Sequence, residues 1–234
     1  MLEKFHVAKE DIIHIKEERL RSVTKEILMT QDISEKDALL ATDALIKADL
    51  RGVESHGVSN MLRAYLGAFK SNSLNPKPNW KIVKETASCA TINSDNGLGI
   101  VVAPQAMEIA VEKAKKTGAG IVTMNNCGHL GMLAYHSMIA SDNDMIGTTM
   151  AACSPRMVPT YSSVRALGTN PISYSAPADK LPDFVFDAAM TSVAGNKIVL
   201  ASRLNVPLSP GWIADKDGNP IMEEVNIEEL NHEN

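Results

Sequence analysis

Long apolar runs are absent from this 234-residue chain, and the absence excludes one class of protein. A helix that crosses a bilayer needs ~20 consecutive, mostly apolar residues, and no stretch approaches that length. The N-terminal segment, MLEKFHVAKEDIIHIKEE, carries too many charges for a secretory signal. We therefore expect a cytoplasmic protein without a membrane partner.

Cysteine is scarce, and basic residues form no large block. Cys89, Cys127 and Cys153 lack metal-ligand spacing and are odd in number, which fits reduced thiols and predicts no metal site. The formal net charge of -5 argues against nucleic acid or an anionic membrane as a partner. The short KAKK run at 113–116 is interpreted as the solvated last turn of a helix.

The patterns that are present alternate between helix and strand and predict an α/β (α+β-like) fold. Residues 9–70 have mostly helical periodicity, and Ser34 is placed to cap a helix, with Asp37 three residues on. The next clear helix is 101–116, with Pro104 in its first turn and Gly118 past its end. A later helix is expected at 191–204, and strands are expected at 80–93, 118–122, 145–152, 172–176 and 184–187.

A turn-forming segment at 71–79 separates the helical part from the remainder. We accordingly expect three regions: an N-terminal helical region at 1–75, a mixed-sheet region at 76–220 and an acidic tail at 221–234.

One candidate site is the run Ser55, His56, Gly57, which lies between two helical patterns. A histidine where one helix gives way to another has a fixed backbone and can exchange a proton near neutral pH. A histidine that only caps a helix is the alternative, and this motif alone favours that alternative.

A second histidine, His129, lies in a polar turn between a strand pattern and a helical pattern, with Gly128 and Gly131 beside it. Glycines let backbone N–H groups approach a ligand, and a helix N-terminus favours anionic groups such as phosphates. An ordinary loop with a solvated histidine is the alternative. The neighbouring Cys127 is interpreted as a packing residue.

The motifs together resemble those of the type 2 malate/L-lactate dehydrogenase family, which also includes ureidoglycolate, sulfolactate and cyclic-imine oxidoreductases. The resemblance runs from about residue 9 to about residue 220. It implies a non-Rossmann fold with a mixed, largely antiparallel sheet and an N-terminal helical region. Four motifs carry it in the family's order and spacing: SHG, GHLG, GTNP at 168–171 and FDAAMTSVAGNKI at 186–198.

The sequence agrees with this fold in lacking the G-x-G-x-x-G of doubly wound nucleotide-binding domains. The nearest approach, NGLGIVV from Asn96, lacks the third glycine and opens no βαβ unit. A nicotinamide cofactor must then be held by a different backbone arrangement.

The resemblance implies an NAD- or NADP-dependent oxidoreductase that interconverts a small 2-hydroxy acid, of the malate or lactate type, and its 2-oxo acid. It also implies a homodimer or higher homo-oligomer. His129 is the favoured acid/base, with His56 as its partner or rival and Ser55 orienting His56 or passing it a proton. For one of the two histidines, the alternative is a role only as a substrate-orienting hydrogen-bond donor. A sibling activity of the same family, or an inactive remnant that acts as a binding or oligomerising module, are the alternatives.

Further contacts follow from the resemblance. Thr169 is expected at the substrate, and a simple turn is its alternative. Asp187 is expected to hold a ribose hydroxyl or to orient an imidazole, and a cap for the following helix is its alternative. The implied cofactor-binding residues are the phosphate cradle Leu130, Gly131 and Met132, together with Asp187, Ala188 and Ala189.

The chain departs from the family in two places. Many members carry an arginine four residues after the SHG histidine, suited to bidentate carboxylate binding. Asn60 stands here and cannot supply that charge, so Arg63 or Arg51 takes the role or the substrate differs. The residues expected to bind the substrate are Thr169, Arg63 and Asn60.

The second departure is at the end of the chain. Members of the family continue past the segment at 211–220 through a further cofactor segment into long helices, whereas this sequence ends in EEVNIEELNHEN. We therefore expect a shortened chain in which several N-terminal apolar side chains are partly exposed, namely Ile12, Ile13, Leu20, Val23 and Ile27.

Overall fold

A computed structural model describes residues 3–6 and 8–227, which form two compact units. The helix–sheet unit contains residues 15–149 and 173–187, and the terminal unit contains the other described residues. The expected boundary near residue 75 lies inside the helix–sheet unit, and the division into three regions stays a prediction. Residues 228–234 of the expected acidic tail lie outside the described residues.

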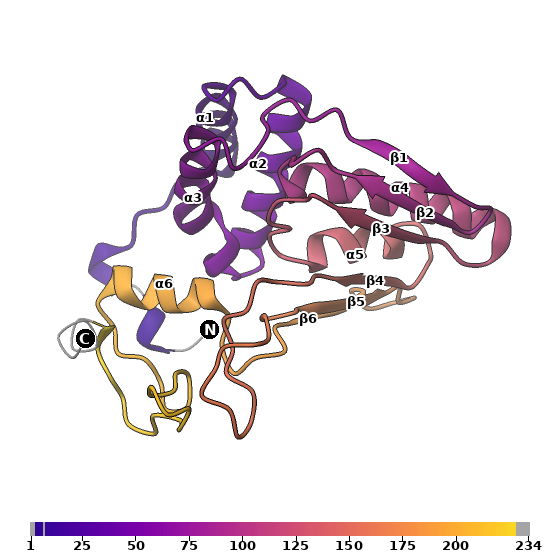
Figure 1. The fold of residues 1–234 in the computed structure, drawn as a ribbon. Coiled ribbons are helices and arrows are strands. Elements are labelled where there is room, and N and C mark those ends of the chain that lie inside the picture. Colours follow the sequence, from indigo (N-terminus) through magenta and orange to yellow (C-terminus); the bar gives the residue numbers. More distant parts are fainter. Residues whose placement is uncertain (1–2, 7, 228–234) are drawn as a thin grey trace. The chain divides into compact units, whose positions relative to one another are not determined.

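The helix–sheet unit begins with three helices that share one apolar core (Figure 1). Ser34 caps the second helix as predicted, because its Oγ accepts the Asp37 backbone N–H at 3.1 Å. Leu28, Leu45 and Tyr65, one from each helix, are buried together in this core. The helices are α1 (Glu17–Met29), α2 (Glu35–Leu50) and α3 (Val58–Lys70), and the one-turn 3-10 helix η3 (Glu54–His56) precedes α3.

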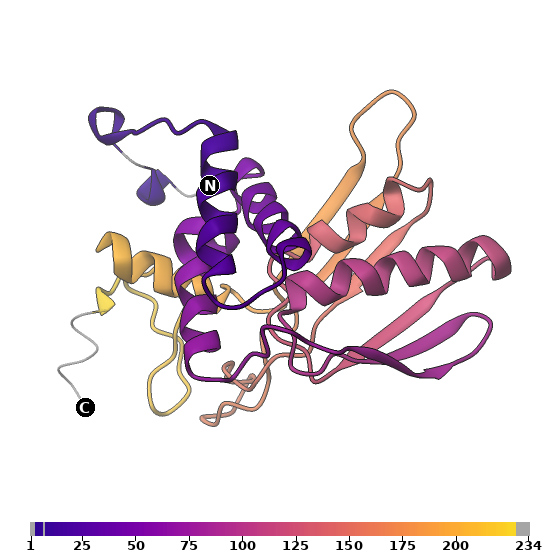
Figure 2. The ribbon, with the colours of Figure 1, turned by 90° about the horizontal axis from the view of Figure 1, so that it is seen from above.

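A first sheet has the strand order β1-β2-β3 and is mixed, as the sequence predicts. Strand β2 pairs antiparallel with β1 and parallel with β3. A parallel pair needs a crossover, and the helix α4 supplies it while packing along one face of the sheet (Figure 2). The elements are β1 (Lys81–Glu85), β2 (Cys89–Asn93), α4 (Gly99–Thr117) and β3 (Ile121–Asn125).

Helix α4 differs from the prediction at its start. It begins at Gly99 rather than 101, so Pro104 lies beyond the first turn instead of within it. Gly118 ends the helix as predicted, in the left-handed conformation with φ +83°. Because Gly118 terminates α4, strand β3 starts at Ile121 and not at residue 118.

A second sheet, with the order β4-β5-β6, packs against the helix α5. Its serines face the helix: the Ser137 Oγ of α5 lies 2.8 Å from Ser173 Oγ and 2.7 Å from Ser175 Oγ, all three buried. The first strand is shorter than the predicted 145–152. The elements are α5 (Ala134–Ser141), β4 (Gly147–Met150), β5 (Ile172–Ala176) and β6 (Phe184–Ala188).

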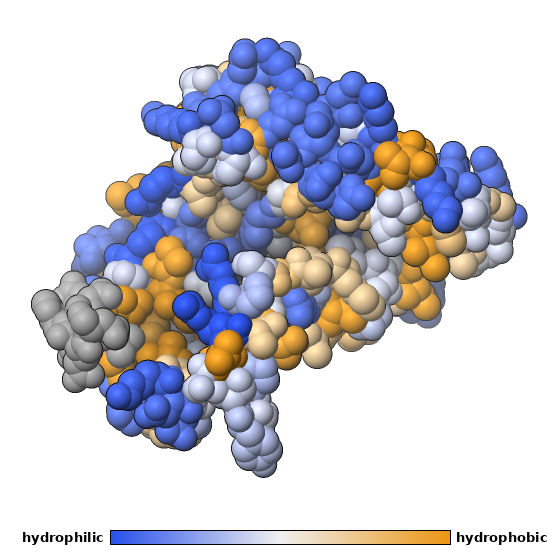
Figure 3. Space-filling view, viewed as in Figure 1, coloured by the Kyte–Doolittle hydropathy of each residue, from blue (hydrophilic) through white to orange (hydrophobic). Residues whose placement is uncertain are grey.

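Aromatic side chains of the second sheet are exposed. Tyr174, Phe184 and Phe186 are all solvent-accessible, and the Tyr174 and Phe186 ring centroids lie 6.4 Å apart. Figure 3 shows apolar surface in the region of this sheet. We call Tyr174, Phe184 and Phe186 the aromatic face. In this sheet the small polar side chains are inside and the aromatic ones outside.

The terminal unit has its own small core, formed by Phe5, Leu200, Ala201 and Leu208. Its longest helix starts later than the predicted residue 191, because the segment before it is irregular. The helices are η1 (Glu3–Phe5), η2 (Lys9–Asp11) and α6 (Gly195–Leu204). In neither unit do the described residues include a helix with the length and apolar content needed to span a membrane.

Candidate active site around two stacked histidines

The SHG motif lies between α2 and α3. Steric contacts explain why its third residue is glycine. The Asp49 carboxylate of α2 reaches across and accepts the Val58 backbone N–H at 2.9 Å, which satisfies one of the unpaired donors at the start of α3. A Cβ on Gly57 would overlap this carboxylate. Desolvation raises the pKa of Asp49. Because Gly57 has no side chain, the Asp49 carboxylate of the preceding helix can cap α3.

Asn60, one turn into α3, stabilises the same motif. It is buried, and its Nδ2 donates to the Ser55 carbonyl oxygen at 2.9 Å. This amide is used inside the fold, where it fixes the backbone that carries Ser55 and His56. Arg63 is exposed, and it has no hydrogen-bond or ion-pair partner among the residues that the structure describes.

The two histidines lie together. The His56 and His129 rings are stacked, with centroids 5.5 Å apart and planes inclined by 12°. The Ser55 Oγ lies 2.9 Å from His56 Nδ1. The structure thus brings Ser55, His56 and His129 into one cluster from two distant segments of the chain.

Tyr65 of α3 is a further member of this cluster, and it lies outside the motifs that the sequence analysis identified. Its hydroxyl lies 2.9 Å from His129 Nδ1, and the residue is only 2% exposed. A buried tyrosine hydroxyl normally has a polar partner. That rule is the signal in the sequence that could have directed attention to Tyr65.

The environment of His129 keeps its ring uncharged. His129 is exposed as a residue, yet the atoms packed around its ring desolvate the imidazole and lower the pKa of His129 to about 4. Burial raises the pKa of Tyr65. Near neutral pH the pair is therefore a neutral imidazole and a protonated phenol.

Another histidine, His136, fixes the backbone of the segment that follows His129. The Nε2 of buried His136 donates to the Leu130 carbonyl oxygen at 2.7 Å. Gly131 has φ +66°, and a Cβ there would lie 2.6 Å from Ile100 Cγ2, so this position requires glycine. Among the described residues, the backbone N–H groups of Leu130 and Met132 have no acceptor. They are the N–H groups of the expected phosphate cradle that have no protein partner there, and Met132 is buried.

Asp187 has a role that neither sequence interpretation contains. Its Oδ2 accepts the Ala134 backbone N–H at 2.7 Å and also binds that of Leu133, so it caps α5. The alternative interpretation, a cap for the following helix, is wrong, because α6 begins only at Gly195 and Ala194 precedes it. Desolvation raises the pKa of Asp187, and the nearby positive charge of Arg51 partly offsets this shift.

Three expected contact residues belong to the terminal unit or to its border. Thr169 lies there in an irregular segment, where its carbonyl oxygen accepts the Met190 N–H at 2.8 Å and Asn170 Oδ1 accepts the Cys153 N–H at 3.0 Å. Ala188 ends β6 and Ala189 follows it. The structure assigns no turn at 168–171, so the alternative for Thr169 is not confirmed, and its contact with the substrate stays a prediction.

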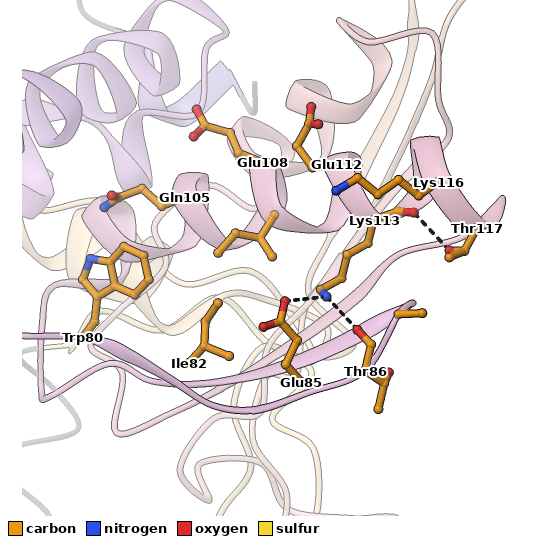
Figure 4. A pocket seen from close by; sticks show the side chains of 12 residues that line it. Trp80, Ile82, Glu85, Thr86, Gln105, Glu108, Glu112, Lys113, Lys116 and Thr117 are labelled. Carbon is orange, nitrogen blue, oxygen red and sulfur yellow. Dashed lines mark hydrogen bonds and ion pairs between the residues drawn. The ribbon is translucent and has the colours of Figure 1, made fainter.

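A cavity of about 660 Å³ opens between β1 and α4 (Figure 4), and its lining includes neither His56 nor His129. Trp80, Ile82 and Ile109 give it apolar walls. Lys113 Nζ contacts Glu85 Oε1 at 2.7 Å and the Thr86 carbonyl oxygen at 2.8 Å. Lys113 is therefore buried, and the expectation of a wholly solvated KAKK run is wrong at this residue.

Metal-ligating side chains are not gathered anywhere in the described ranges: no group of three or more His, Cys, Asp or Glu could hold an ion there. The chemistry of the histidine cluster is that of hydrogen bonding and proton exchange between two imidazoles, a serine hydroxyl and a phenol.

Comparison with known proteins identifies relatives of the whole arrangement. The model of the malate/L-lactate dehydrogenase family matches residues 15–229. An L-sulfolactate dehydrogenase of Methanocaldococcus jannaschii is 39% identical over 88% of this chain and 59% of its own length. A malate dehydrogenase of Pyrococcus horikoshii is 38% identical over 94% of this chain and 60% of its own length.

Solved structures agree. The sulfolactate dehydrogenase from Methanocaldococcus jannaschii superposes with a TM-score of 0.81 at 36% identity, covering 92% of this chain and 64% of that one. The chain spans about 60% of the length of the curated relatives it matches. By the extent of the family match and by these identities, the chain belongs to the malate/L-lactate dehydrogenase family.

Proposed function

We propose that this protein is an NAD(P)-dependent oxidoreductase that interconverts a small 2-hydroxy acid and its 2-oxo acid. The observation that carries the proposal is the stacked pair His56 and His129, with Ser55 Oγ and Tyr65 Oη on their ring nitrogens. Reduction of a carbonyl needs a group that binds its oxygen and a group that supplies a proton. Two imidazoles in one cluster provide both.

The loop after His129 fits a nicotinamide dinucleotide. The backbone N–H groups of Leu130 and Met132 have no acceptor among the described residues, and Gly131 permits the left-handed backbone between them. The start of α5 is less open to a phosphate, because Asp187 already accepts the Ala134 and Leu133 N–H groups. We propose that Asp187, Ala188 and Ala189 line the cofactor site, which is filled by NAD or NADP. When bound, the cofactor supplies or accepts the hydride.

The carboxylate of the substrate needs a cation. Arg63 is the better candidate on α3, since it is exposed and unpaired among the described residues, whereas the Asn60 amide is bound to Ser55. Arg51 is the second candidate, and its charge already acts on Asp187. We propose that Arg63 binds the carboxylate, with Thr169 as a further contact.

Malate, lactate and sulfolactate are the substrate classes that we place first, because relatives named malate and L-sulfolactate dehydrogenase are 38% and 39% identical. Ureidoglycolate and cyclic imines are the alternatives within the family. A binding or oligomerising module without activity is the alternative of another class, and the exposed aromatic face favours it. We also propose a homodimer or higher homo-oligomer in the cytoplasm.

Titration of the full chain with NADH and NADPH tests the proposal. Binding should enhance nicotinamide fluorescence or quench tryptophan emission, and a 2-oxo acid added afterwards should be reduced. The proposal is wrong if neither cofactor changes either signal at millimolar concentration. An inactive binding or oligomerising module would give that result.

A further inference from the structure

Two groups meet at one nitrogen of His129. The Tyr65 hydroxyl lies 2.9 Å from Nδ1, and the Gly131 backbone N–H donates to the same atom at 3.3 Å. Because a backbone N–H can only donate, Nδ1 is the accepting, unprotonated nitrogen. The proton of the neutral ring then lies on Nε2, and Tyr65 is a donor to Nδ1.

Tyr65 is suited to hold this tautomer. It is buried in the α1–α3 core, so its hydroxyl has little freedom to choose another partner. Burial also raises the pKa of Tyr65, so the phenol keeps its proton. Since the pKa of His129 is lowered to about 4, this ring is a hydrogen-bond donor through Nε2 rather than a carrier of charge near neutral pH.

His56 has a different kind of partner. The Ser55 hydroxyl at 2.9 Å from its Nδ1 can donate or accept, so it serves a neutral or a protonated ring equally well. Two charged imidazoles stacked at 5.5 Å would repel each other, so the cluster accommodates one charged ring at most. The backbone N–H at His129 can only donate, whereas the hydroxyl at His56 can donate or accept. This difference suits His129 to stay neutral and His56 to exchange a proton.

We propose that Tyr65 and the Gly131 N–H hold His129 as a neutral hydrogen-bond donor, and that His56 is the histidine that exchanges the proton. The proposal rests on the proposed function. In reduction, His129 Nε2–H would bind the carbonyl oxygen, a hydride from the reduced nicotinamide would add to the carbonyl carbon, and protonated His56 would give its proton to the resulting alkoxide. In oxidation, neutral His56 would take the hydroxyl proton as the hydride leaves the carbon for the oxidised nicotinamide.

The tautomer can be measured without any turnover. Nitrogen-15 NMR of the imidazoles in the full chain, with His129 assigned by the His129→Asn variant, should show a neutral Nε2–H ring from about pH 5 to 8. Tyr65→Phe should shift the Nδ1 resonance and admit the Nδ1–H tautomer. Tyr135→Phe, whose hydroxyl binds Asp43 instead, should leave the His129 resonances unchanged. An Nδ1–H tautomer in the unmodified chain, a ring that titrates in this range, or an unchanged spectrum in Tyr65→Phe would overturn the role of Tyr65.

Turnover separates the two histidines. Glutamine keeps an N–H donor but cannot exchange a proton, so His129→Gln should retain about tenfold more activity than His129→Ala. His56→Gln should be as slow as His56→Ala, with a loss of ~10²-fold or more. The reverse pattern would assign the proton to His129 and overturn the proposal. No turnover of any 2-oxo acid by the unmodified chain would refute the proposed function and the role of His56, while the NMR result would still decide that of Tyr65.

Discussion

Neutral imidazoles characterise this molecule at the scale of single residues. His136 is fully buried, donates through Nε2 to Leu130 and has no partner for Nδ1 among the described residues. Desolvation lowers the pKa of His136 to about 4. Its folded pKa thus lies below the unfolded value of about 6.5, and the unfolded chain binds the proton more readily. Stability should therefore rise with pH between about 4 and 6.5.

We predict that His136→Gln reduces this pH dependence. Glutamine retains an N–H donor for the Leu130 carbonyl oxygen but does not titrate. For the unmodified chain, His136 should lower the free energy of unfolding by about 2 kcal/mol between pH 7 and pH 5. Urea unfolding of both proteins at these two pH values measures the difference. Equal losses in the two proteins would show that His136 is already protonated in the folded state.

At the scale of elements, α3 and α5 are both capped by carboxylates from other elements of the chain. Neither α3 nor α5 has a side-chain cap of its own, and Asp49 and Asp187 supply carboxylates to their first N–H groups. Both helices adjoin a histidine of the cluster. The two acids therefore fix the segments from which His56 and His129 project.

We predict that Gly57→Ala destabilises the chain by about 1–3 kcal/mol, since its Cβ must displace the Asp49 carboxylate. Gly67→Ala is the matched control, because it lies in the same helix with nothing within 4 Å of its Cβ. The control should be neutral or stabilise by up to about 1 kcal/mol. Thermal unfolding compares the two. Similar melting temperatures would contradict the close approach of Asp49.

Local sequence predicted the elements better than the contacts between them. The Ser34 cap, the Gly118 terminus and the strand–turn–helix around His129 depend on neighbouring residues, and the structure contains all three. The cap of α5 by Asp187 joins segments far apart in sequence. Local periodicity contains no information about such pairings, so they were missed.

The candidate site was also predicted in its local motifs and not in the contacts between them. The motifs located both histidines, and the structure shows them stacked. Tyr65 was missed because it lies outside the motifs, and helical spacing reports which side a residue faces and not what its hydroxyl binds. Asn60 was considered for the substrate, although its burial commits it to Ser55.

Unpaired apolar surface is the main feature at the scale of the whole chain. Ile12, Ile13 and Val23 are exposed, and Leu20 and Ile27 are partly exposed, as the sequence predicts. The aromatic face adds a second apolar surface on the β4–β6 sheet. Surfaces of this kind favour association.

We predict that the aromatic face takes part in self-association. Replacing Phe184 and Phe186 by threonine should lower the apparent mass in sedimentation, because both side chains are exposed and threonine suits a strand. Val83→Thr, at an exposed position of β1, should leave the mass unchanged. An identical mass for all three proteins would exclude the aromatic face from the interface.

Steady-state turnover of the full chain tests the central claim most directly. Oxidation of NADH or NADPH is followed with oxaloacetate, pyruvate and sulfopyruvate, for the unmodified chain and for His56→Ala. We expect at least one 2-oxo acid to be reduced, and the substitution to slow that reaction by ~10²–10⁴-fold. Near-equal turnover by the two proteins would contradict the assignment of a dehydrogenase site to the stacked histidines.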